Sequence, residues 1–402
     1  MKLLLVTHYW RPHCGGIETM TWEQARRLAK RGHRVSVVTS RLPGDPRFSR
    51  DHGIDIHRVT ALNTFEKLGI PYPLFSLQLL PLLSRLVPEH DAVLVYNHSY
   101  LSSVAGALIA RLRGRPMVLF QASPYIHYKF PWNVVERVAD STLGSSTLRL
   151  ADKLVAISEH TADHVKSLLP GRPVEVLYLG ADTSCFTPVA SSVEQTQIRA
   201  HLGLPSEAFI VSTVRRLVHR NGVGTLLAAA NRLKHHGDIY IVIIGTGPER
   251  AAIEKYIESR QLHNVRLMGF VSDKQLPDFY RASDAFVLPT RSGEGFGLVL
   301  LEAFACGVPV ISTRSGAPVE VVDHGRTGLL IPPESPAEMA AAILNLRSHP
   351  ETLARMKQAA RARAVEMDWE ICVDGVEDVL AQLTNGKHPV PGVGQGYRIG
   401  GH

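Results

Sequence analysis

Residues 289–320 read PTRSGEGFGLVLLEAFACGVPVISTRSGAPVE, and this stretch decides the fold. It follows a short apolar run, Ala285–Leu288, that is typical of a buried parallel strand. A glycine-rich turn, Gly293–Gly297, comes next, and the apolar run Leu298–Cys306 predicts a helix. The free N–H groups and the dipole of a first helical turn favour an anion, so we expect a phosphate site here. The residues expected to line it are Gly295, Phe296, Gly297 and Leu298.

Two carboxylates belong to the same stretch. Glu302 lies in a nine-residue run whose other members are Leu, Val, Ala, Phe and Cys. A lone carboxylate in such a run is costly unless it has a partner or faces a ligand. Glu294 lies seven intervening residues earlier, in the glycine turn. A diphosphate held by backbone amides, with a carboxylate gripping hydroxyls on either side, describes a nucleotide sugar.

The order of residues around these carboxylates resembles the donor-site signature of family 4 retaining glycosyltransferases. Two Glu residues at this spacing occur by chance in many chains, but the GFG, CGVPV and HGRTGLL segments around them make the match specific. The alternative is a glycine turn before a solvated helix. The matching positions are Glu294, Glu302, Ala303, Gly307, Pro309, Val310, Gly316, Glu320, Gly325, Thr327 and Gly328.

The resemblance implies the glycosyltransferase B (GT-B) architecture, in which two Rossmann-like, doubly wound α/β domains face each other across a cleft. In that family the N-terminal domain carries the acceptor and the C-terminal domain the nucleotide sugar. The chain itself alternates buried strands with helices twice over, which favours the same fold class. From Gly328 to about Leu383 we expect helix, broken near Met367. We predict an acceptor domain at 1–187, a boundary segment at 188–207, a donor domain at 208–366, a helix crossing back at 367–384 and a mobile tail at 385–402.

Cations for the diphosphate are expected in Thr213–Gly222, TVRRLVHRNG. This segment resembles the family's G-R-L-x-x-x-K-G, whose Arg and Lys clasp the diphosphate. Arg216 matches the Arg, but Arg215 stands in place of the first Gly and Asn221 in place of the Lys. Because negative charge develops on the departing diphosphate, a cation is needed, and Arg220 can supply it. We therefore expect Glu294, Arg216 and Arg220 to act in catalysis and Asn221 to line the donor site. The alternative for each Arg is a solvated surface side chain.

Glycines at other strand ends complete the expected donor site. Gly15 and Gly16 follow the first strand, at the edge where open α/β sheets bind ligands. The resemblance places them against the donor phosphates or the acceptor, and the alternative is a tight turn and no more. It also places the nucleotide base against the backbone near Gly269 and Val271, and Gly245 begins the turn after an earlier strand.

The acceptor side departs from the family pattern. The family has a His just past the strand that ends at Phe120, where this chain has Gln121-Ala122. Gln121 can hydrogen-bond a sugar hydroxyl, and His127 reaches the site only if its loop folds back. In retaining members of the family the leaving diphosphate accepts the acceptor's proton, so a protein base is dispensable. We predict no cofactor and no metal, because no Asp-x-Asp pair is present.

Composition restricts the partners. The chain has 402 residues, 45% hydrophobic and 20% charged, and its four cysteines are far apart, which favours a globular protein of the reduced cytoplasm. The net charge of +7 comes without a compact Lys/Arg block, so we expect no nucleic-acid partner. An anionic membrane surface or a diphosphate substrate accounts for it better.

The apolar, proline-broken stretch Leu68–Leu83 bears on the acceptor. One interpretation places it on the inner face of a membrane, as part of a peripheral protein that uses a lipid-linked or polysaccharide glycan acceptor. The other interpretation is a buried core helix, with a soluble acceptor. A nucleotide-sugar-binding subunit of weak activity is the alternative to an active transferase. Basic residues recur nearby at Arg85, Arg111, Arg113, Arg115, Lys129 and Arg137.

Overall fold

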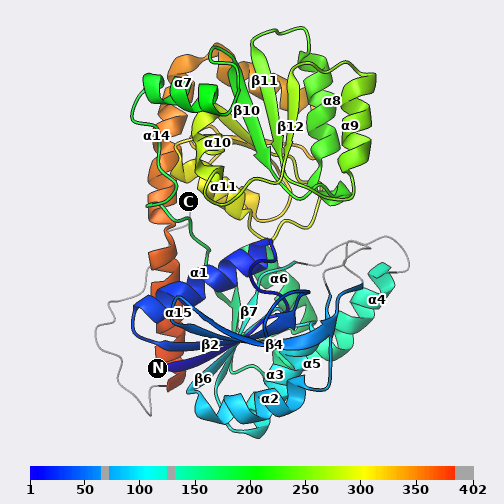
Figure 1. Ribbon diagram of the computed structural model, residues 1–402, viewed down its shortest axis with the longest axis vertical. Coiled ribbons are helices and arrows are strands. Elements are labelled where there is room, and N and C mark those ends of the chain that lie inside the picture. Colours follow the sequence, from blue (N-terminus) through cyan, green and yellow to red (C-terminus); the bar gives the residue numbers. More distant parts are fainter. Residues whose placement is uncertain (65–71, 125–131, 385–402) are drawn as a thin grey trace. The chain divides into compact units, whose positions relative to one another are not determined.

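The computed structural model describes residues 1–64, 72–124 and 132–384 and divides into two compact units (Figure 1). Unit 1 comprises Met1–Leu179 together with the chain from Trp369, and unit 2 comprises Gly180–Asp368. The chain enters and leaves unit 2 side by side, because the Ala181 N–H donates to the Met367 carbonyl over 2.9 Å.

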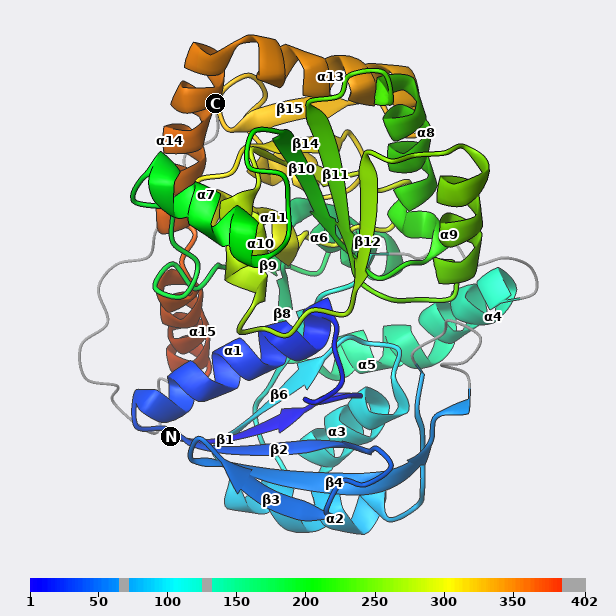
Figure 2. The ribbon, with the colours of Figure 1, turned by 45° about the horizontal axis from the view of Figure 1, so that its top comes forward.

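Unit 1 is built on one sheet with the strand order β3-β4-β2-β1-β6-β7-β8-β9. All neighbours are parallel except β3 and β5, which run antiparallel to β4. Figure 2 shows β3 and β4 at one edge of this sheet. Its strands are β1 (Lys2–Val6), β2 (Arg34–Arg41), β3 (Phe48–Asp51), β4 (Ile54–Leu62), β5 (Leu74–Phe75), β6 (Ala92–Tyr96), β7 (Met117–Gln121), β8 (Lys153–Ala156) and β9 (Glu175–Val176).

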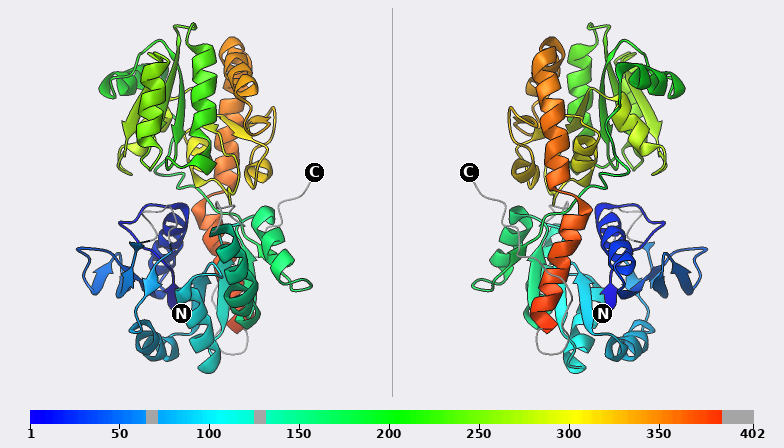
Figure 3. Two further views of the ribbon diagram at one scale, coloured as in Figure 1. Left: turned by 90° about the vertical axis from the view of Figure 1, so that its right-hand side faces the viewer. Right: turned by 90° about the vertical axis from the view of Figure 1, so that its left-hand side faces the viewer.

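The helices of unit 1 connect these strands, and one comes from the far end of the sequence. They are α1 (Gly16–Lys30), α2 (Leu79–Leu86), α3 (Leu101–Leu112), α4 (Trp132–Ala139), α5 (Ser145–Leu150), α6 (Glu159–Leu168) and α15 (Trp369–Thr384). Helix α15 packs along α1 (Figure 3). Arg31, just after α1, donates to Asp374 over 2.6 Å and to Glu370 and Glu377 over 2.7 Å. One guanidinium fork thus ties three turns of the last helix to unit 1.

Unit 2 has six parallel strands in the order β12-β11-β10-β13-β14-β15. Counted within the unit this is 3-2-1-4-5-6, the order of the dinucleotide-binding Rossmann fold. The strands are β10 (Phe209–Val214), β11 (Ile239–Ile244), β12 (Val265–Gly269), β13 (Ala285–Leu288), β14 (Val310–Thr313) and β15 (Gly328–Ile331). The helices are α7 (Ser192–His201), α8 (Val223–Leu233), α9 (Arg250–Ser259), α10 (Leu276–Ala282), α11 (Leu298–Ala305), α12 (Pro318–Val321), α13 (Pro336–Ser348) and α14 (Pro350–Glu366).

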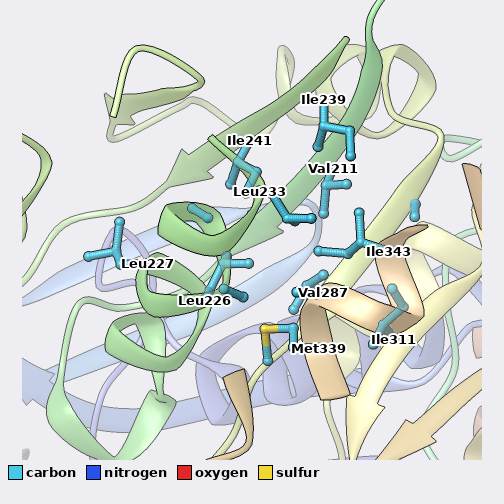
Figure 4. Close-up of a cluster of buried hydrophobic side chains, with 14 of the residues drawn as sticks. Val211, Leu226, Leu227, Leu233, Ile239, Ile241, Val287, Ile311, Met339 and Ile343 are labelled. Carbon is cyan, nitrogen blue, oxygen red and sulfur yellow. The ribbon is translucent and has the colours of Figure 1, made fainter. Parts of the chain in front are cut away.

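Helices cover both faces of the unit 2 sheet, which makes it doubly wound. On one face, Leu226 and Leu233 of α8 and Ile343 of α13 pack against Val211 and Ile241 of the strands (Figure 4). A second cluster, on the other face, joins α7 and α10 to β10 and β11 through Leu204, Phe279, Ile210 and Val242. Because both faces are buried, the strands are continuous apolar runs such as IYIVII in β11.

The domain boundaries differ from those expected at 187 and 207. The units change at Leu179, because the segment after it packs on unit 2, where Arg361 donates to the carbonyls of Thr183 and Phe186. The expected linker 188–207 contains α7, which is capped by the Ser191 side chain and tied to the sheet by a 2.7 Å ion pair between Arg199 and Asp284. The expectation of helix from Gly328 is also wrong, since Gly328–Ile331 form the edge strand β15. The tail predicted at 385–402 lies outside the described residues.

The apolar stretch considered for membrane contact divides in the structure. Leu79, Leu83 and Leu86 of α2 are buried in the core of unit 1, whereas Leu77 and Leu80 are exposed. The buried-helix interpretation therefore accounts for α2, and Leu68–Pro71 fall outside the described residues. Within the described part of the chain, none of the helices combines the length and the apolar character that a membrane span needs.

Candidate functional site

The strand order of unit 2 places a ligand crevice between β10 and β13, because the winding direction reverses there. The loops that leave the carboxyl ends of these strands carry Arg215 and Arg216 on one side and Thr290 on the other. The two loops are closely packed. Gly222 has a φ of +74°, and a Cβ at this position would collide with the carbonyl oxygen of Pro289.

The glycine turn leads into α11 as expected. Gly297 precedes the helix with a φ of +89°, and no side chain caps the helix, so an anion can interact with its first turn. Phe296 is buried beneath the turn, and Leu298 is the first helical residue. The Ala317 N–H donates to the Glu294 carbonyl over 3.2 Å, which closes the turn from the β14 side.

Glu294 has a buried partner that the sequence analysis did not foresee. Its Oε2 accepts hydrogen bonds from the Arg215 guanidinium over 2.7 Å and from the Thr290 hydroxyl over 3.2 Å. Burial lowers the pKa of Arg215, and the adjacent Glu294 carboxylate opposes that shift. From the sequence, Arg215 is only a departure from the family's Gly. Its signal was a charged residue directly after a buried strand.

Glu302 also has a partner, as its apolar surroundings required. The Tyr280 hydroxyl of α10 donates to Glu302 Oε2 over 2.7 Å. Burial, and then the nearby Glu302 charge, raise the pKa of Tyr280 well above its ordinary value, so Tyr280 remains a donor. Glu302 itself is half-buried and keeps part of its surface accessible.

The structure brings Arg220 to the glycine turn. Its Nη1 lies 3.6 Å from the place a Cβ would occupy on Gly293, and its carbonyl accepts from the Arg291 N–H over 2.9 Å. Arg216 is exposed, and within the described chain neither Arg216 nor Arg220 has an ion-pair partner. The Asn221 amide donates to the Arg216 carbonyl over 2.7 Å, so it braces the loop. Arg220 therefore lies beside the uncapped turn, and Arg216 is an exposed cation of the same loop.

The remaining donor-side positions lie at the same sheet edge. The Gly245 N–H donates to the Gly269 carbonyl over 2.8 Å, and a Cβ on Gly245 would collide with the Arg215 carbonyl oxygen. Val271 packs against the cluster around α10. Their contact with a bound donor stays a prediction.

Unit 1 has a buried titratable cluster at its own reversal point, between β1 and β6. His13 Nδ1 lies 2.8 Å from Glu18 Oε1, and a Cβ on Gly15 would collide with the same carboxylate. His8 is stacked on Tyr100, and burial lowers the pKa of His8 to about 4. A side chain at Gly15 would therefore displace the Glu18 carboxylate, whereas a Cβ on Gly16 meets nothing within 4 Å. Glu18 is not among the site residues predicted from the sequence.

Gln121 faces the protein interior. Its Oε1 accepts from His98 Nδ1 over 2.8 Å and its Nε2 donates to the Ser123 carbonyl over 2.6 Å, which leaves little of the amide for a sugar hydroxyl. His98 Nε2 in turn lies 3.0 Å from Asp140 Oδ1. Burial by itself would raise the pKa of Asp140, but hydrogen bonds from His164 and His98 lower this pKa to about 2.

His98, Asp140 and His164 lie close enough to hold a metal ion, with their ligand atoms within 4.8 Å of one another. Among the described residues this is the one group of three with that property. The expected absence of a metal stays a prediction. His127 lies outside the described residues, and Ala122 is buried with its N–H bonded to Asn97 Oδ1 over 2.8 Å.

Comparison with known proteins agrees with this arrangement. A family profile described as "Glycosyl transferases group 1" matches residues 194–363, and one described as "Glycosyltransferase Family 4" matches residues 14–184. D-inositol 3-phosphate glycosyltransferase 1 of Catenulispora acidiphila is 30% identical over 94% of this chain and 93% of its own. A GDP-mannose-dependent alpha-(1-6)-phosphatidylinositol monomannoside mannosyltransferase of Mycobacterium tuberculosis is 30% identical over 94% of this chain and 98% of its own.

Solved structures show the fold. Anabaena Alr3699/HepE in complex with UDP superimposes with a TM-score of 0.76 at 21% identity, over 95% of this chain and all of that one. A sucrose-phosphate synthase from Thermosynechococcus elongatus superimposes with a TM-score of 0.78 at 21% identity, over 96% of this chain and all of that one. The chain therefore has the GT-B fold, belongs to glycosyltransferase family 4, and is a glycosyltransferase that uses a nucleotide-sugar donor.

Proposed function

We propose that this protein transfers a sugar, with retention of its anomeric configuration, from a nucleoside-diphosphate sugar to a hydroxyl of a phosphorylated polyol acceptor. One observation carries the donor half. At the reversal point of unit 2, the uncapped start of α11 and Arg220 lie at the glycine turn that carries Glu294, Arg216 lies in the same loop as Arg220, and Glu302 follows within α11. Cations and amides suit a diphosphate, and carboxylates suit hydroxyl groups.

Each group then has a role. The first turn of α11, Arg216 and Arg220 hold the diphosphate and stabilise the charge that develops as its bond to the sugar C1 breaks. Glu302 accepts hydrogen bonds from the ribose, and Glu294 from the transferred sugar. The acceptor oxygen bonds to C1 on the face that the diphosphate leaves, and its proton passes to a diphosphate oxygen. This sequence needs no protein base at Ala122 and no metal.

The acceptor class rests on the relatives. Two of them are named for acceptors that contain a phosphorylated inositol, one soluble and one a membrane lipid. We propose the lipid form, on a peripheral protein at the inner membrane face. Helix α4 supports this choice, because Val134 and Val138 are 50% and 55% exposed and Arg137 lies beside them. An apolar stripe flanked by a cation suits an anionic lipid surface.

The test is a transfer assay with a panel of UDP- and GDP-sugars. Each donor is offered with soluble inositol phosphate, with phosphatidylinositol in liposomes, and with no acceptor. We expect transfer to the liposomal acceptor. NMR of the product should show the same anomeric configuration, axial or equatorial, as in the donor. Transfer to soluble inositol phosphate alone would contradict the membrane assignment. Tight donor binding with no transfer to either acceptor would favour the binding-subunit alternative.

A further inference from the structure

Arg215, Thr290 and Glu294 form a closed hydrogen-bonded triangle. Arg215 Nη1 donates to Thr290 Oγ1 over 2.7 Å, and Nη2 donates to Glu294 Oε2 over 2.7 Å. The Thr290 hydroxyl, having accepted from Arg215, donates to the same Oε2 over 3.2 Å. The side chain of Arg215 is 5% exposed and that of Glu294 is 19% exposed. The triangle is therefore largely shielded from water.

The fold does not require this buried charge. A buried ion pair is a weak source of stability, because the desolvation of both charges offsets their attraction. The family segment that Thr213–Gly222 resembles has Gly in place of Arg215, so β10 and its loop can form without an arginine. The guanidinium therefore has another use, and what it holds is Glu294.

The two carboxylate oxygens of Glu294 have different hydrogen-bond surroundings. Oε2 accepts from both Arg215 and Thr290, whereas Oε1 has no hydrogen-bond partner in the described part of the chain. A carboxylate fixed at one oxygen cannot rotate to present both oxygens to a ligand. Oε1 is left as a single acceptor of fixed direction at the rim of the glycine turn.

We propose that Arg215 is a positioning residue that fixes Glu294 through Oε2, so that Oε1 accepts one hydroxyl of the transferred sugar and discriminates among donor sugars. This inference rests on the proposed function. A sugar whose hydroxyl points away from Oε1 leaves a desolvated carboxylate oxygen unpaired, and the loss of a hydrogen bond to a charged group reduces turnover by about 10- to 100-fold.

Arg215 does not have the properties of a phosphate ligand. Both of its Nη groups are used within the protein, and its charge is matched by Glu294. Arg216 and Arg220 are the cations of this loop without an ion-pair partner among the residues described. Loss of Arg215 should therefore alter how the sugar is handled and leave the affinity for the bare nucleoside diphosphate unchanged.

The experiment is a double-mutant cycle with Arg215→Met, Glu294→Gln and the double variant. Two quantities are measured for each: the Kd of the nucleoside diphosphate, by calorimetry, and kcat/KM for two donors that are epimers at one hydroxyl. We expect unchanged diphosphate affinity, a loss of about tenfold or more for the preferred donor, and a smaller ratio between the epimers. The double variant should be no worse than Glu294→Gln, because Arg215 acts through Glu294.

Two outcomes would overturn the proposal: weaker diphosphate binding in Arg215→Met, or fully additive losses in the double variant. Should Arg215→Met fail to fold, Thr290→Val removes the two hydrogen bonds of the Thr290 hydroxyl without stranding a charge, and the same smaller epimer ratio is expected. Arg215→Lys restores the charge but not the two-point hold, so it should recover stability and only part of the discrimination. If the wild type turns over no donor, the proposed function fails, whereas an intact wild type with additive losses contradicts this inference alone.

Discussion

Tyr280 donates a 2.7 Å hydrogen bond to Glu302 from a side chain that is completely buried. The tyrosine belongs to α10 and the glutamate to α11, so the bond fixes the expected ribose ligand against a neighbouring helix. A neutral donor orients the carboxylate without bringing a positive charge to it.

Tyr280→Phe removes this donor and should lower the free energy of unfolding by about 1–3 kcal/mol, because Glu302 Oε2 loses a buried partner. The Kd of the nucleoside diphosphate should rise as well, since the carboxylate is no longer held. Denaturant melts and calorimetry measure the two effects. Tyr256→Phe, also in unit 2, is the matched control, and equal effects from both variants would show that the hydroxyl bond is unimportant.

Glu302→Gln and Glu294→Gln should separate nucleotide binding from sugar transfer. Glu302→Gln is expected to weaken binding of the bare nucleoside diphosphate by about tenfold, because the proposed charged acceptor for the ribose hydroxyls is lost. Glu294→Gln should leave that affinity alone and lower kcat. The assignment of Glu302 to the ribose is wrong if calorimetry gives the same Kd for Glu302→Gln and the wild type.

Arg216→Ala and Arg220→Ala should each lower turnover by about 10²-fold, the usual scale for one lost transition-state donor. Arg326→Ala, which removes an exposed arginine elsewhere in unit 2, is the control for a general change of charge. Steady-state kinetics give the result. An unaltered rate in Arg220→Ala would mean that Asn221 marks a weakened site and would favour the binding-subunit alternative.

Metal removal should leave activity unchanged, because in the proposed mechanism arginines and backbone amides supply the charge at the diphosphate. The assay compares turnover before and after dialysis against EDTA. A loss that added Mg²⁺ or Mn²⁺ restores would contradict metal independence. His164→Ala would then show whether the group formed by His98, Asp140 and His164 holds that metal.

His8 should make the stability of unit 1 depend on pH. Its ordinary pKa of 6.5 falls to about 4 in the folded protein, mainly through burial, while Glu18 raises it and His13 lowers it further. Between these values the unfolded chain binds a proton that the folded chain does not, so stability falls as pH drops from 6.5 towards 4. The total loss is about 3 kcal/mol.

His8→Phe keeps the ring stacked on Tyr100 and should remove this slope. Denaturant melts between pH 5 and 6.5 compare it with the wild type, in a range where Glu18 stays ionised in both. His57 and His90 also have pKa values lowered by burial, but they are present in both proteins and cancel in the difference. Parallel pH curves for the two proteins would show that His8 is not the group responsible.

The sequence predicted those parts of the fold that depend on short, local sequence patterns. Continuous apolar runs predicted the buried strands, and the glycine turn before Leu298 predicted the start of α11, which the structure has. The alternation of strands and helices predicted the fold class, and the comparisons confirm it. Strand β15 was mistaken for helix because GLLI, a four-residue apolar run, has no periodicity of its own.

For the candidate site, the sequence predicted the glycine turn and the helix that follows it. It did not predict which side chains pair with Glu294 and Glu302. Arg215 and Glu294 are far apart in the sequence and meet only because β10 and β13 are neighbours in the sheet. The same is true of Tyr280 and Glu302, which meet through the packing of two helices. Local pattern gives a residue's element, but the neighbour across a parallel sheet depends on strand order.

The return of the chain from unit 2 to unit 1 has a consequence for synthesis on the ribosome. Unit 2 is continuous, and its two ends meet where Ala181 bonds to Met367, so every residue of its fold has been made before α15 emerges. Unit 1 is synthesised first, but Arg31 and the face of α1 have no partners until Glu370, Asp374 and Glu377 of α15 have been made. Unit 1, which starts translation, is therefore the last to be completed, and a chain truncated near residue 368 would contain all of unit 2 but an unfinished unit 1.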